Sequence, residues 1–265
     1  SGVGESGVTV QGNYLGTSAD GSAAAANALG LNVINGTAHQ IGGVLPSQRN
    51  LVSGNTGVSI NLSSSTTRVV VEGNYVGTNA AGNAAVHNGG AMGAYGAGDN
   101  RVGGTTAGAG NVLTEGIYVN GPRTLVQGNL IGTNAAGTAV LTTPTLGNGL
   151  QVAAGGPGSI IGGTQAGAGN VISGFSGFGI GLIGTDVTVQ GNLIGTNITG
   201  TVALPNATGV SLSSGSLRAM VGGATAGAGN VISGNAGAGF TLTDSGATIV
   251  GNIIGMNKAR SEEHT

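Results

Sequence analysis

Charged side chains that could take part in catalysis are few, and the densest group lies near the middle of the chain. It consists of Asp99, Arg101, Glu115 and Arg123. Carboxylates beside a guanidinium can serve in general acid–base chemistry. However, Glu72 is expected to point outward from the strand preceding Arg101, where the two form a cross-strand pair. Exposed pairs of this kind contribute about 0–1 kcal/mol. We therefore predict an ion pair and no catalytic residue, and we keep Asp99, Arg101 and Glu115 as surface candidates.

The rest of the sequence offers no other recognisable reaction centre. His39 and His87 are expected in loops with no carboxylate near them in sequence, so neither forms a ligand pair or a triad. No Gly-Lys-Ser/Thr phosphate loop and no nonapeptide calcium repeat occurs. Asp186, Arg218 and Asp244 are predicted at one corner on successive coils, as solvated side chains. We expect no cofactor, and loop carbonyl oxygens are the only ligands that the sequence leaves open for a metal ion.

The composition excludes several classes of protein. The 265 residues include 58 glycines, only 6% are charged, and the net charge is −2 with seven Lys and Arg. So few cations cannot neutralise a nucleic-acid backbone. The absence of cysteine excludes disulfides and thiolate metal sites. No apolar run approaches the roughly 18–20 residues of a membrane span. A hydrophobic content of 39% with so little charge also argues against disorder.

Two related phrases repeat along the chain. One reads Gly-Asn, two apolar residues, then Gly-Thr-Asn, and the other reads Asn-Val-Ile-Ser-Gly-Asn. Each returns after about 60 residues, which is typical of a repeat architecture. Short and long steps between the leading asparagines alternate, which indicates two coils per repeat. These asparagines are Asn13, Asn50, Asn74, Asn111, Asn129, Asn170, Asn192, Asn230 and Asn252.

Columns of apolar residues predict three short strands in each coil. Two positions after each leading asparagine stands an aliphatic residue, from Leu15 to Ile254, and an earlier, mostly β-branched column runs from Val10 to Ile249. The first strand of each coil alternates with period two, with Val58 and Ile60 inward in one case. Its outward positions are expected to be Ser59, Tyr118, Gln151, Ser211 and Thr241. The fold class is therefore all-β, a parallel β-helix of about nine coils with a length of roughly 43 Å.

The glycine and asparagine content follows from the tight corners of such coils. Corners need positive φ, which glycine adopts freely and asparagine tolerates, as at Gly73-Asn74 and Gly128-Asn129. Asparagines stacked at one corner can also hydrogen-bond to one another along the axis. The nine leading asparagines are therefore predicted to be structural.

The phrases Val189 to Asn197 and Gly227 to Asn235 resemble the right-handed parallel β-helix repeats of large bacterial secreted and surface proteins, whose fold is that of the pectate-lyase-like superfamily. The resemblance covers about residues 7–257 and is specific for fold rather than function. Polysaccharide lyases and hydrolases of this superfamily usually work along the first strands, with carboxylates and often an Arg or Lys. None of the expected outward positions is acidic or basic. Tyr118 beside Gln151 could line a sugar site, although surface packing is the simpler interpretation.

We therefore expect residues 1–259 to be one β-solenoid segment of a longer bacterial protein, extracellular or on the cell surface. Its expected role is structural or adhesive and not catalytic by itself. Its partners would be a polysaccharide or a host-surface ligand and further repeats of the same chain. A second hypothesis is a carbohydrate-binding or polysaccharide-degrading enzyme with its active coils elsewhere. A third is an ice-binding solenoid, since Thr17, Thr78, Thr133 and Thr196 repeat in register.

Both ends of the sequence carry expectations of their own. The last six residues, 260–265, resemble the translation of a sequencing-library adapter, and we predict a non-native tail there. Solenoids normally cap their terminal coils. Neither end resembles a cap, so we expect open edges and association end to end.

Overall fold

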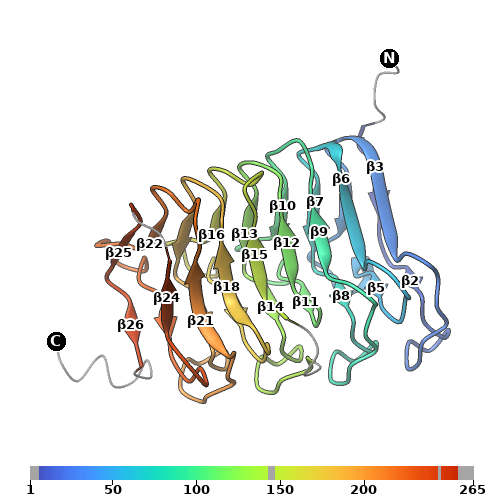
Figure 1. Cartoon of the computed structure of the whole chain (residues 1–265). Helices are drawn as coiled ribbons and strands as arrows, with labels where there is room; N and C mark the ends of the chain where they lie inside the picture. Colours follow the sequence, from blue (N-terminus) through green and yellow to red (C-terminus); the bar gives the residue numbers. More distant parts are fainter. Residues whose placement is uncertain (1–5, 143–146, 244–245, 256–265) are drawn as a thin grey trace.

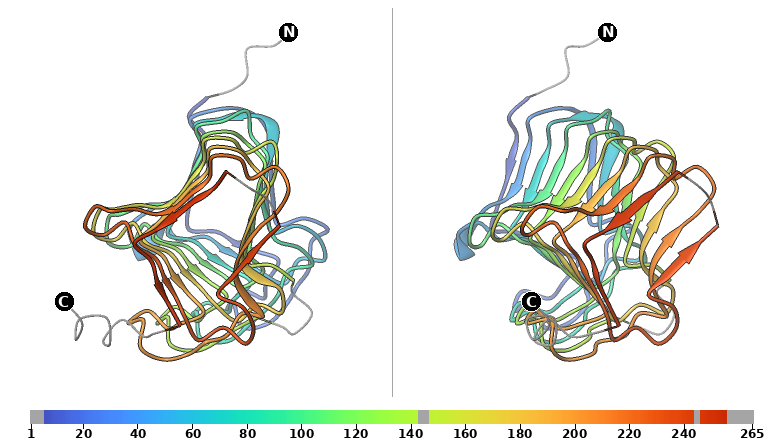
Figure 2. Two further views of the ribbon diagram at one scale, coloured as in Figure 1. Left: turned by 60° about the vertical axis from the view of Figure 1, so that its left-hand side comes forward. Right: turned by 90° about the vertical axis from the view of Figure 1, so that its left-hand side faces the viewer.

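Short parallel strands, three to a coil, stack into three sheets that enclose one apolar interior (Figures 1 and 2). The computed structural model describes residues 6–142, 147–243 and 246–255. Within them there are nine coils and almost no helix, apart from the 3-10 turn η1 (Pro46–Gln48). The arrangement is the all-β, right-handed parallel β-helix that the sequence predicts. The tail predicted at 260–265 lies outside the described residues.

A coil contributes no more than one strand to each sheet, so strands that follow one another in sequence lie in different sheets; sheets B and C have nine strands and sheet A has eight. Sheet A contains β3 (Leu31–Thr37), β6 (Ile60–Thr67), β9 (Met92–Ala94), β12 (Ile117–Val119), β15 (Leu150–Val152), β18 (Phe178–Leu182), β21 (Thr208–Leu212) and β24 (Phe240–Leu242). Sheet B contains β1 (Thr9–Val10), β4 (Gln40–Gly42), β7 (Val70–Glu72), β10 (Arg101–Gly103), β13 (Leu125–Gln127), β16 (Ile160–Gly162), β19 (Thr188–Gln190), β22 (Met220–Gly222) and β25 (Thr248–Val250). Sheet C contains β2 (Tyr14–Leu15), β5 (Leu51–Val52), β8 (Tyr75–Val76), β11 (Val112–Leu113), β14 (Leu130–Ile131), β17 (Val171–Ile172), β20 (Leu193–Ile194), β23 (Val231–Ile232) and β26 (Ile253–Ile254).

The apolar columns predicted for sheets B and C are confirmed in register. Val102 lies between Val71 and Val126 on neighbouring strands, and Leu113 lies between Val76 and Ile131. These side chains are almost fully buried. Aliphatic residues on every coil therefore form one continuous core along the axis.

The predicted register of sheet A is wrong at the second coil. Ile60 and Leu62 are the buried pair of β6, and Asn61 is the residue between them in the outward row. Ser59 is instead fully buried just before the strand, and Val58 makes only an isolated bridge to Gly90. Both interpretations satisfy a period of two, so alternation alone could not separate registers that differ by two residues.

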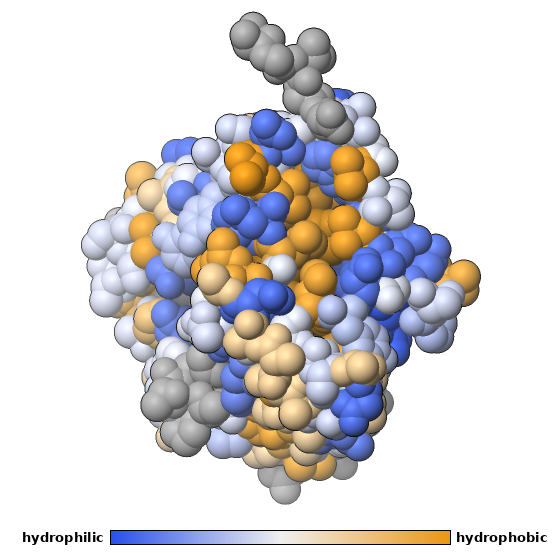
Figure 3. Space-filling model, turned by 90° about the vertical axis from the view of Figure 1, so that its right-hand side faces the viewer, coloured by the Kyte–Doolittle hydropathy of each residue, from blue (hydrophilic) through white to orange (hydrophobic). Residues whose placement is uncertain are grey.

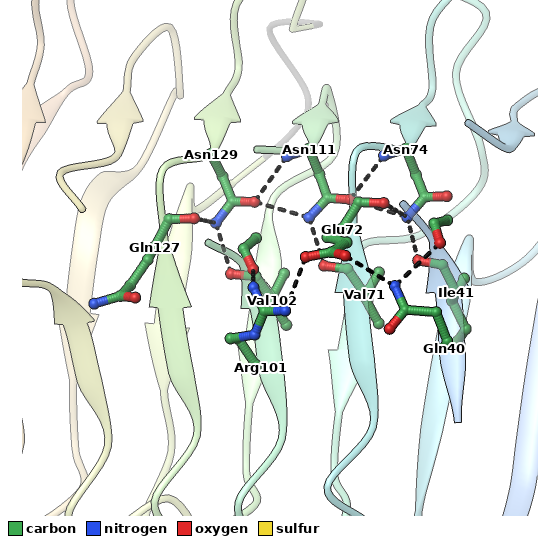
Figure 4. Close-up of polar contacts among 12 residues, drawn as sticks. Gln40, Ile41, Val71, Glu72, Asn74, Arg101, Val102, Asn111, Gln127 and Asn129 are labelled. Carbon is green, nitrogen blue, oxygen red and sulfur yellow. Dashed lines mark hydrogen bonds and ion pairs between the residues drawn. The ribbon is translucent and has the colours of Figure 1, made fainter. Parts of the chain in front are cut away.

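The predicted asparagine ladder is present at the corner between sheets B and C (Figure 4). At each step the backbone N–H and the side-chain Nδ2 of one asparagine donate to the Oδ1 of the asparagine on the next coil. For Asn111 and Asn129 these distances are 3.0 and 2.8 Å. Nδ2 of Asn129 also donates to the backbone oxygens of Val102 and Gln127. The buried amides therefore satisfy one another and fix the spacing of the coils.

Candidate functional site

The outward row of sheet A is the surface where catalytic side chains are expected in a solenoid of this kind. Its members are neutral on all eight strands: Asn32, Asn61, Gly93, Tyr118, Gln151, Gly181, Ser211 and Thr241. The row has no carboxylate, histidine, lysine or arginine, the groups that usually serve as general acid or base. It can bind a ligand only through hydroxyls, amides and rings.

Two aromatic rings and an amide lie together in the middle of this row. The ring centroids of Tyr95 and Tyr118 are 5.5 Å apart. Tyr95 lies over Gly93, where a Cβ would be only 2.2 Å from its ring, so glycine is required for this arrangement. Gln151 pairs with Tyr118 on the next strand, and its Oε1 accepts a hydrogen bond from Nδ2 of Asn148. The sequence singled out Tyr118 and Gln151 but missed Tyr95, because Tyr95 follows the end of β9.

The structure divides the charged group predicted near residue 100 among separate places. Arg101 binds Glu72 across sheet B, with 2.8 Å between Nη2 and Oε2, which confirms the predicted ion pair (Figure 4). Asp99 and Arg123 pair at the corner between sheets A and B. Glu115 lies at the corner between sheets C and A. These residues therefore do not form one reaction centre.

A regular feature of sheet B explains the Glu72–Arg101 pair. Gln11, Gln127 and Gln190 each donate their side-chain Nε2 to the carbonyl oxygen of a glycine on the next coil. Glu72 occupies the equivalent place, and its carboxylate has no proton to donate. The carbonyl oxygen of Gly103, which a glutamine at position 72 would reach, instead accepts a hydrogen bond from Arg101, and Arg101 also donates to Glu72. The Glu72–Arg101 pair thus takes the place of one glutamine-to-glycine hydrogen bond in this row along sheet B.

Two exposed ion pairs occupy the corner between sheets A and B. Arg123 binds Asp99 through Nε and Nη2 at 2.7 and 2.9 Å, and Arg218 binds Asp186 in the same two-pronged way. The Arg123 guanidinium lowers the pKa of Asp99, and that of Arg218 lowers the pKa of Asp186, mainly by hydrogen bonding. The structure thus pairs Asp186 with Arg218, which were predicted as merely solvated. Asp244 lies outside the described residues.

We expect the Asp186–Arg218 pair to give a small, salt-sensitive stabilisation. Because the pKa of Asp186 is lowered on folding, its contribution is present above the ordinary aspartate pKa and is lost as the pH falls through the lowered one. Arg218→Gln should therefore lower Tm slightly near neutral pH, and the effect should disappear in high salt or strong acid. A double-mutant cycle with Asp186→Asn measures the coupling. Coupling that persists in high salt would contradict this account.

Glu115 belongs to a second ladder that the sequence did not reveal. At the corner between sheets C and A, Asn27, Asn55 and Asn88 repeat the donor and acceptor pattern of the first ladder. Glu115 takes the next place and is buried. Its Oε1 accepts from the Asn88 backbone N–H at 2.7 Å, and His87 Nδ1 lies 3.5 Å away.

The function of Glu115 in this arrangement is to complete the ladder as an acceptor. Thr114 also donates to its Oε1, at 2.8 Å, and itself lies fully buried. His87 Nδ1 is 3.2 Å from the same hydroxyl. Although Thr114, His87 and Glu115 resemble a nucleophile, a base and an acid in type, the hydroxyl has no access to a substrate. The signal that could have found this contact is the column Asn27, Asn55, Asn88, Glu115.

A shallow apolar hollow lies on the outer face of sheet C. It encloses about 330 Å³ between two families of loops, and Tyr75, Val112 and Leu130 are among its lining residues. Arg49 stacks on the Tyr75 ring at 3.9 Å and donates to the carbonyl oxygen of Gly73. No carboxylate or histidine lines it, so it offers contact area without acid–base groups.

Other kinds of site are equally absent from the described residues. No three His, Cys, Asp or Glu side chains among them lie close enough to hold a metal ion. That part of the chain also has no helix with the length and hydropathy needed to cross a membrane. No family model, curated protein or solved structure matches the chain. Its geometry is therefore the guide to its function.

Proposed function

We propose that the chain is a structural or adhesive solenoid segment of a large bacterial protein, outside the cell or on its surface, and is not catalytic by itself. The observation that carries this proposal is the outward row of sheet A, which has no acidic or basic side chain on any of its eight strands. The acidic side chains nearby, Glu72, Asp99, Glu115 and Asp186, are held in ion pairs or in the second ladder. What remains is a regular rod that can carry other domains or present loops.

Polysaccharide turnover tests this proposal directly. The chain should release no product from pectate, alginate or related polymers, with or without Ca²⁺, while a polysaccharide lyase assayed alongside confirms each substrate. Turnover by the chain would overturn the proposal. If the activity disappeared in Glu115→Gln or His87→Gln while the fold persisted, the reaction would belong to the corner between sheets C and A.

Carbohydrate binding without cleavage is a second candidate function, and the Tyr95–Tyr118 pair favours it. Neighbouring tyrosine rings offer flat, half-exposed surfaces, and Gln151 adds an amide on the next strand. Tyr118→Ala should then abolish retention on an insoluble polysaccharide, whereas Tyr14→Ala, which removes an exposed ring on sheet C, should not. Equal retention of both variants would remove the support for this candidate.

The repeated threonines give little support to ice binding. Thr78 and Thr133 are fully buried, and Thr196 is almost so. Thr78 and Thr133 donate their hydroxyls to the carbonyl oxygens of the residues that follow them. An ice-binding face needs its hydroxyls at the surface, so a thermal-hysteresis signal would require a different face.

A further inference from the structure

A third aromatic ring lies on the outer face of sheet A, beyond Tyr95 and Tyr118. Phe178 begins β18, and two atoms of its ring lie 2.9 and 3.1 Å from the place that a Cβ of Gly181 would take. Gly181 belongs to the outward row, so the Phe178 ring covers this row in the same way as the Tyr95 ring covers it at Gly93. Both glycines are buried under these rings, because only a residue without a side chain leaves room for them.

The three rings and the Gln151 amide follow one another on neighbouring strands. Tyr95 comes directly after β9, Tyr118 is on β12, Gln151 is on β15 and Phe178 is on β18, and these four strands are consecutive in sheet A (Figure 1). Gln151 pairs with Gly181, which lies beneath the Phe178 ring. At about 4.8 Å between strands, the four side chains extend over roughly 14 Å along the solenoid axis. We call these four side chains the sheet A platform.

Asn148 holds the amide of Gln151 in place within the platform. Its Nδ2 donates to Oε1 of Gln151 at 3.4 Å, and its Oδ1 accepts from the backbone N–H of Phe178 at 3.2 Å. Within the described residues, Nε2 of Gln151 and the hydroxyls of Tyr95 and Tyr118 have no hydrogen-bond partner. The platform therefore combines flat apolar faces with polar groups that a ligand can reach.

A role in the core does not account for the three rings. Figure 3 shows apolar side chains gathered at the N-terminal face of the described solenoid, and Leu31 and Val33 of β3 pack against the core cluster. Tyr95, Tyr118 and Phe178 belong neither to this cluster nor to the side chains packed against it. Packing of the interior thus explains Leu31 and Val33, and it does not explain the rings.

The charge of the platform limits the ligand to an uncharged one. The outward row is neutral on every strand of sheet A, and the closest ion pair, Asp99 with Arg123, already matches its own charges. An acidic polymer would lose hydration on this surface with no cation to pair with it. A nucleic acid would meet the same obstacle at every phosphate.

The contact between the rings favours a ligand with a flat face. The centroids of Tyr95 and Tyr118 are 5.5 Å apart, a distance at which aromatic rings touch, so no slot separates them. A proline-rich peptide binds in grooves between aromatic side chains, which contacting rings do not provide. A sugar ring presents a flat face of C–H groups with hydroxyls around its rim. It can therefore lie on these rings while its hydroxyls bond to the amide of Gln151.

We propose that the sheet A platform binds an uncharged polysaccharide, whose sugar rings stack on Tyr95, Tyr118 and Phe178 along the solenoid axis. Gln151 donates to a sugar oxygen, and Asn148 acts through Gln151 as a positioning residue. The inference rests on carbohydrate binding, the second candidate function above, and adds to it the class of ligand and the third ring. Neutral chains of glucose, mannose or N-acetylglucosamine belong to this class, and polymers of uronic acids do not.

Glycine substitutions test the platform without removing a ring. Gly93→Ala places a methyl group 2.2 Å from the present position of the Tyr95 ring, and Gly181→Ala places one 2.9 Å from that of Phe178, so each ring must move. Gly90→Ala is the matched control, because no atom lies closer than 3.6 Å to its Cβ. None of the three glycines has a left-handed φ, so alanine adds no backbone strain. Circular dichroism verifies that each variant is folded.

Retention of the full chain on insoluble polymers gives the readout. Cellulose, chitin and mannan are the neutral polymers, and calcium pectate and calcium alginate gels are the acidic ones. The unaltered chain and Gly90→Ala should be retained on a neutral polymer and washed from the acidic gels. Gly93→Ala and Gly181→Ala should each raise Kd about tenfold, the loss of one stacked ring.

The outcomes separate this inference from the functions proposed above. Retention on the acidic gels alone, or unchanged retention of both ring-displacing variants, would overturn the inference and leave carbohydrate binding standing. Retention on none of the polymers would overturn both. Release of soluble fragments from a retained neutral polymer would support the platform and overturn the non-catalytic role of the chain.

Discussion

Replacing Asn129 by alanine is expected to lower the free energy of unfolding by about 2–6 kcal/mol. The Oδ1 of Asn129 is the acceptor for both the backbone N–H and the Nδ2 of Asn111, and all of these atoms are buried. A buried donor left without an acceptor costs about 1–3 kcal/mol, and alanine orphans two of them. The carbonyl of Val102 loses a donor as well. Urea unfolding followed by circular dichroism measures the loss, and exchange of the Asn111 amide hydrogen locates it.

The first asparagine of the same ladder supplies the control. Asn13 is exposed, and within the described residues nothing donates to its Oδ1. Asn13→Ala removes only the hydrogen bonds that its own Nδ2 makes to Gln11 and Asn50. We expect its cost to be below about 1 kcal/mol, the net value of a hydrogen bond near solvent. Equal losses in the two variants would mean that the ladder fills a corner without stabilising it through hydrogen bonds.

The contrast between the two ladders shows why sequence predicts one corner and not the other. Each asparagine of the first ladder is followed two positions later by an inward aliphatic residue, so the local phrase identifies it. In the second ladder only Asn55 and Asn235 stand in a repeated phrase, as its closing asparagine. The ladder is also interrupted where Glu115 and Phe175 take the asparagine's place. Its other members stand in loops of different length, so they form a column only once the coils are aligned with one another.

The charged residues follow the same rule. The Glu72–Arg101 contact was predictable because both residues lie on strands whose register the apolar columns define. Asp99 and Arg123 lie in the turns between strands, and Glu115 meets His87 across two loops of different length. The period of a strand defines where each of its side chains lies along the solenoid axis. A loop of variable length does not define this for its residues. The ion pair between strands was therefore predictable, and the contacts of Asp99, Arg123 and Glu115 in the turns were not.

Alanine in place of Gly162 should destabilise the fold by about as much as the loss of a ladder asparagine. Gly162 has φ +84°, and a Cβ there would lie 2.0 Å from the carbonyl oxygen of Gln190 on the next coil. That oxygen already accepts from Gly163 N–H and from Asn192 Nδ2, so it is held in place. Left-handed backbone in a non-glycine residue costs about 1–2 kcal/mol. Overpacking adds about 1–3 kcal/mol. Gly162→Ala should therefore cost about 2–5 kcal/mol in urea unfolding.

Two other glycines separate the backbone contribution from the steric one. Gly7 has φ +72°, but no heavy atom of the described residues lies within 4 Å of the place that a methyl group would take, so Gly7→Ala should show the backbone cost alone. Around Gly147 no heavy atom of the described residues lies within 4 Å of a Cβ, and no left-handed φ is recorded, so Gly147→Ala should be neutral or stabilising by up to about 1 kcal/mol. The expected order of loss is Gly162, then Gly7, then Gly147. If Gly162→Ala lowers the free energy of unfolding no more than Gly7→Ala does, the next coil has moved to make room for the methyl group. The ladders would then not fix the spacing between coils.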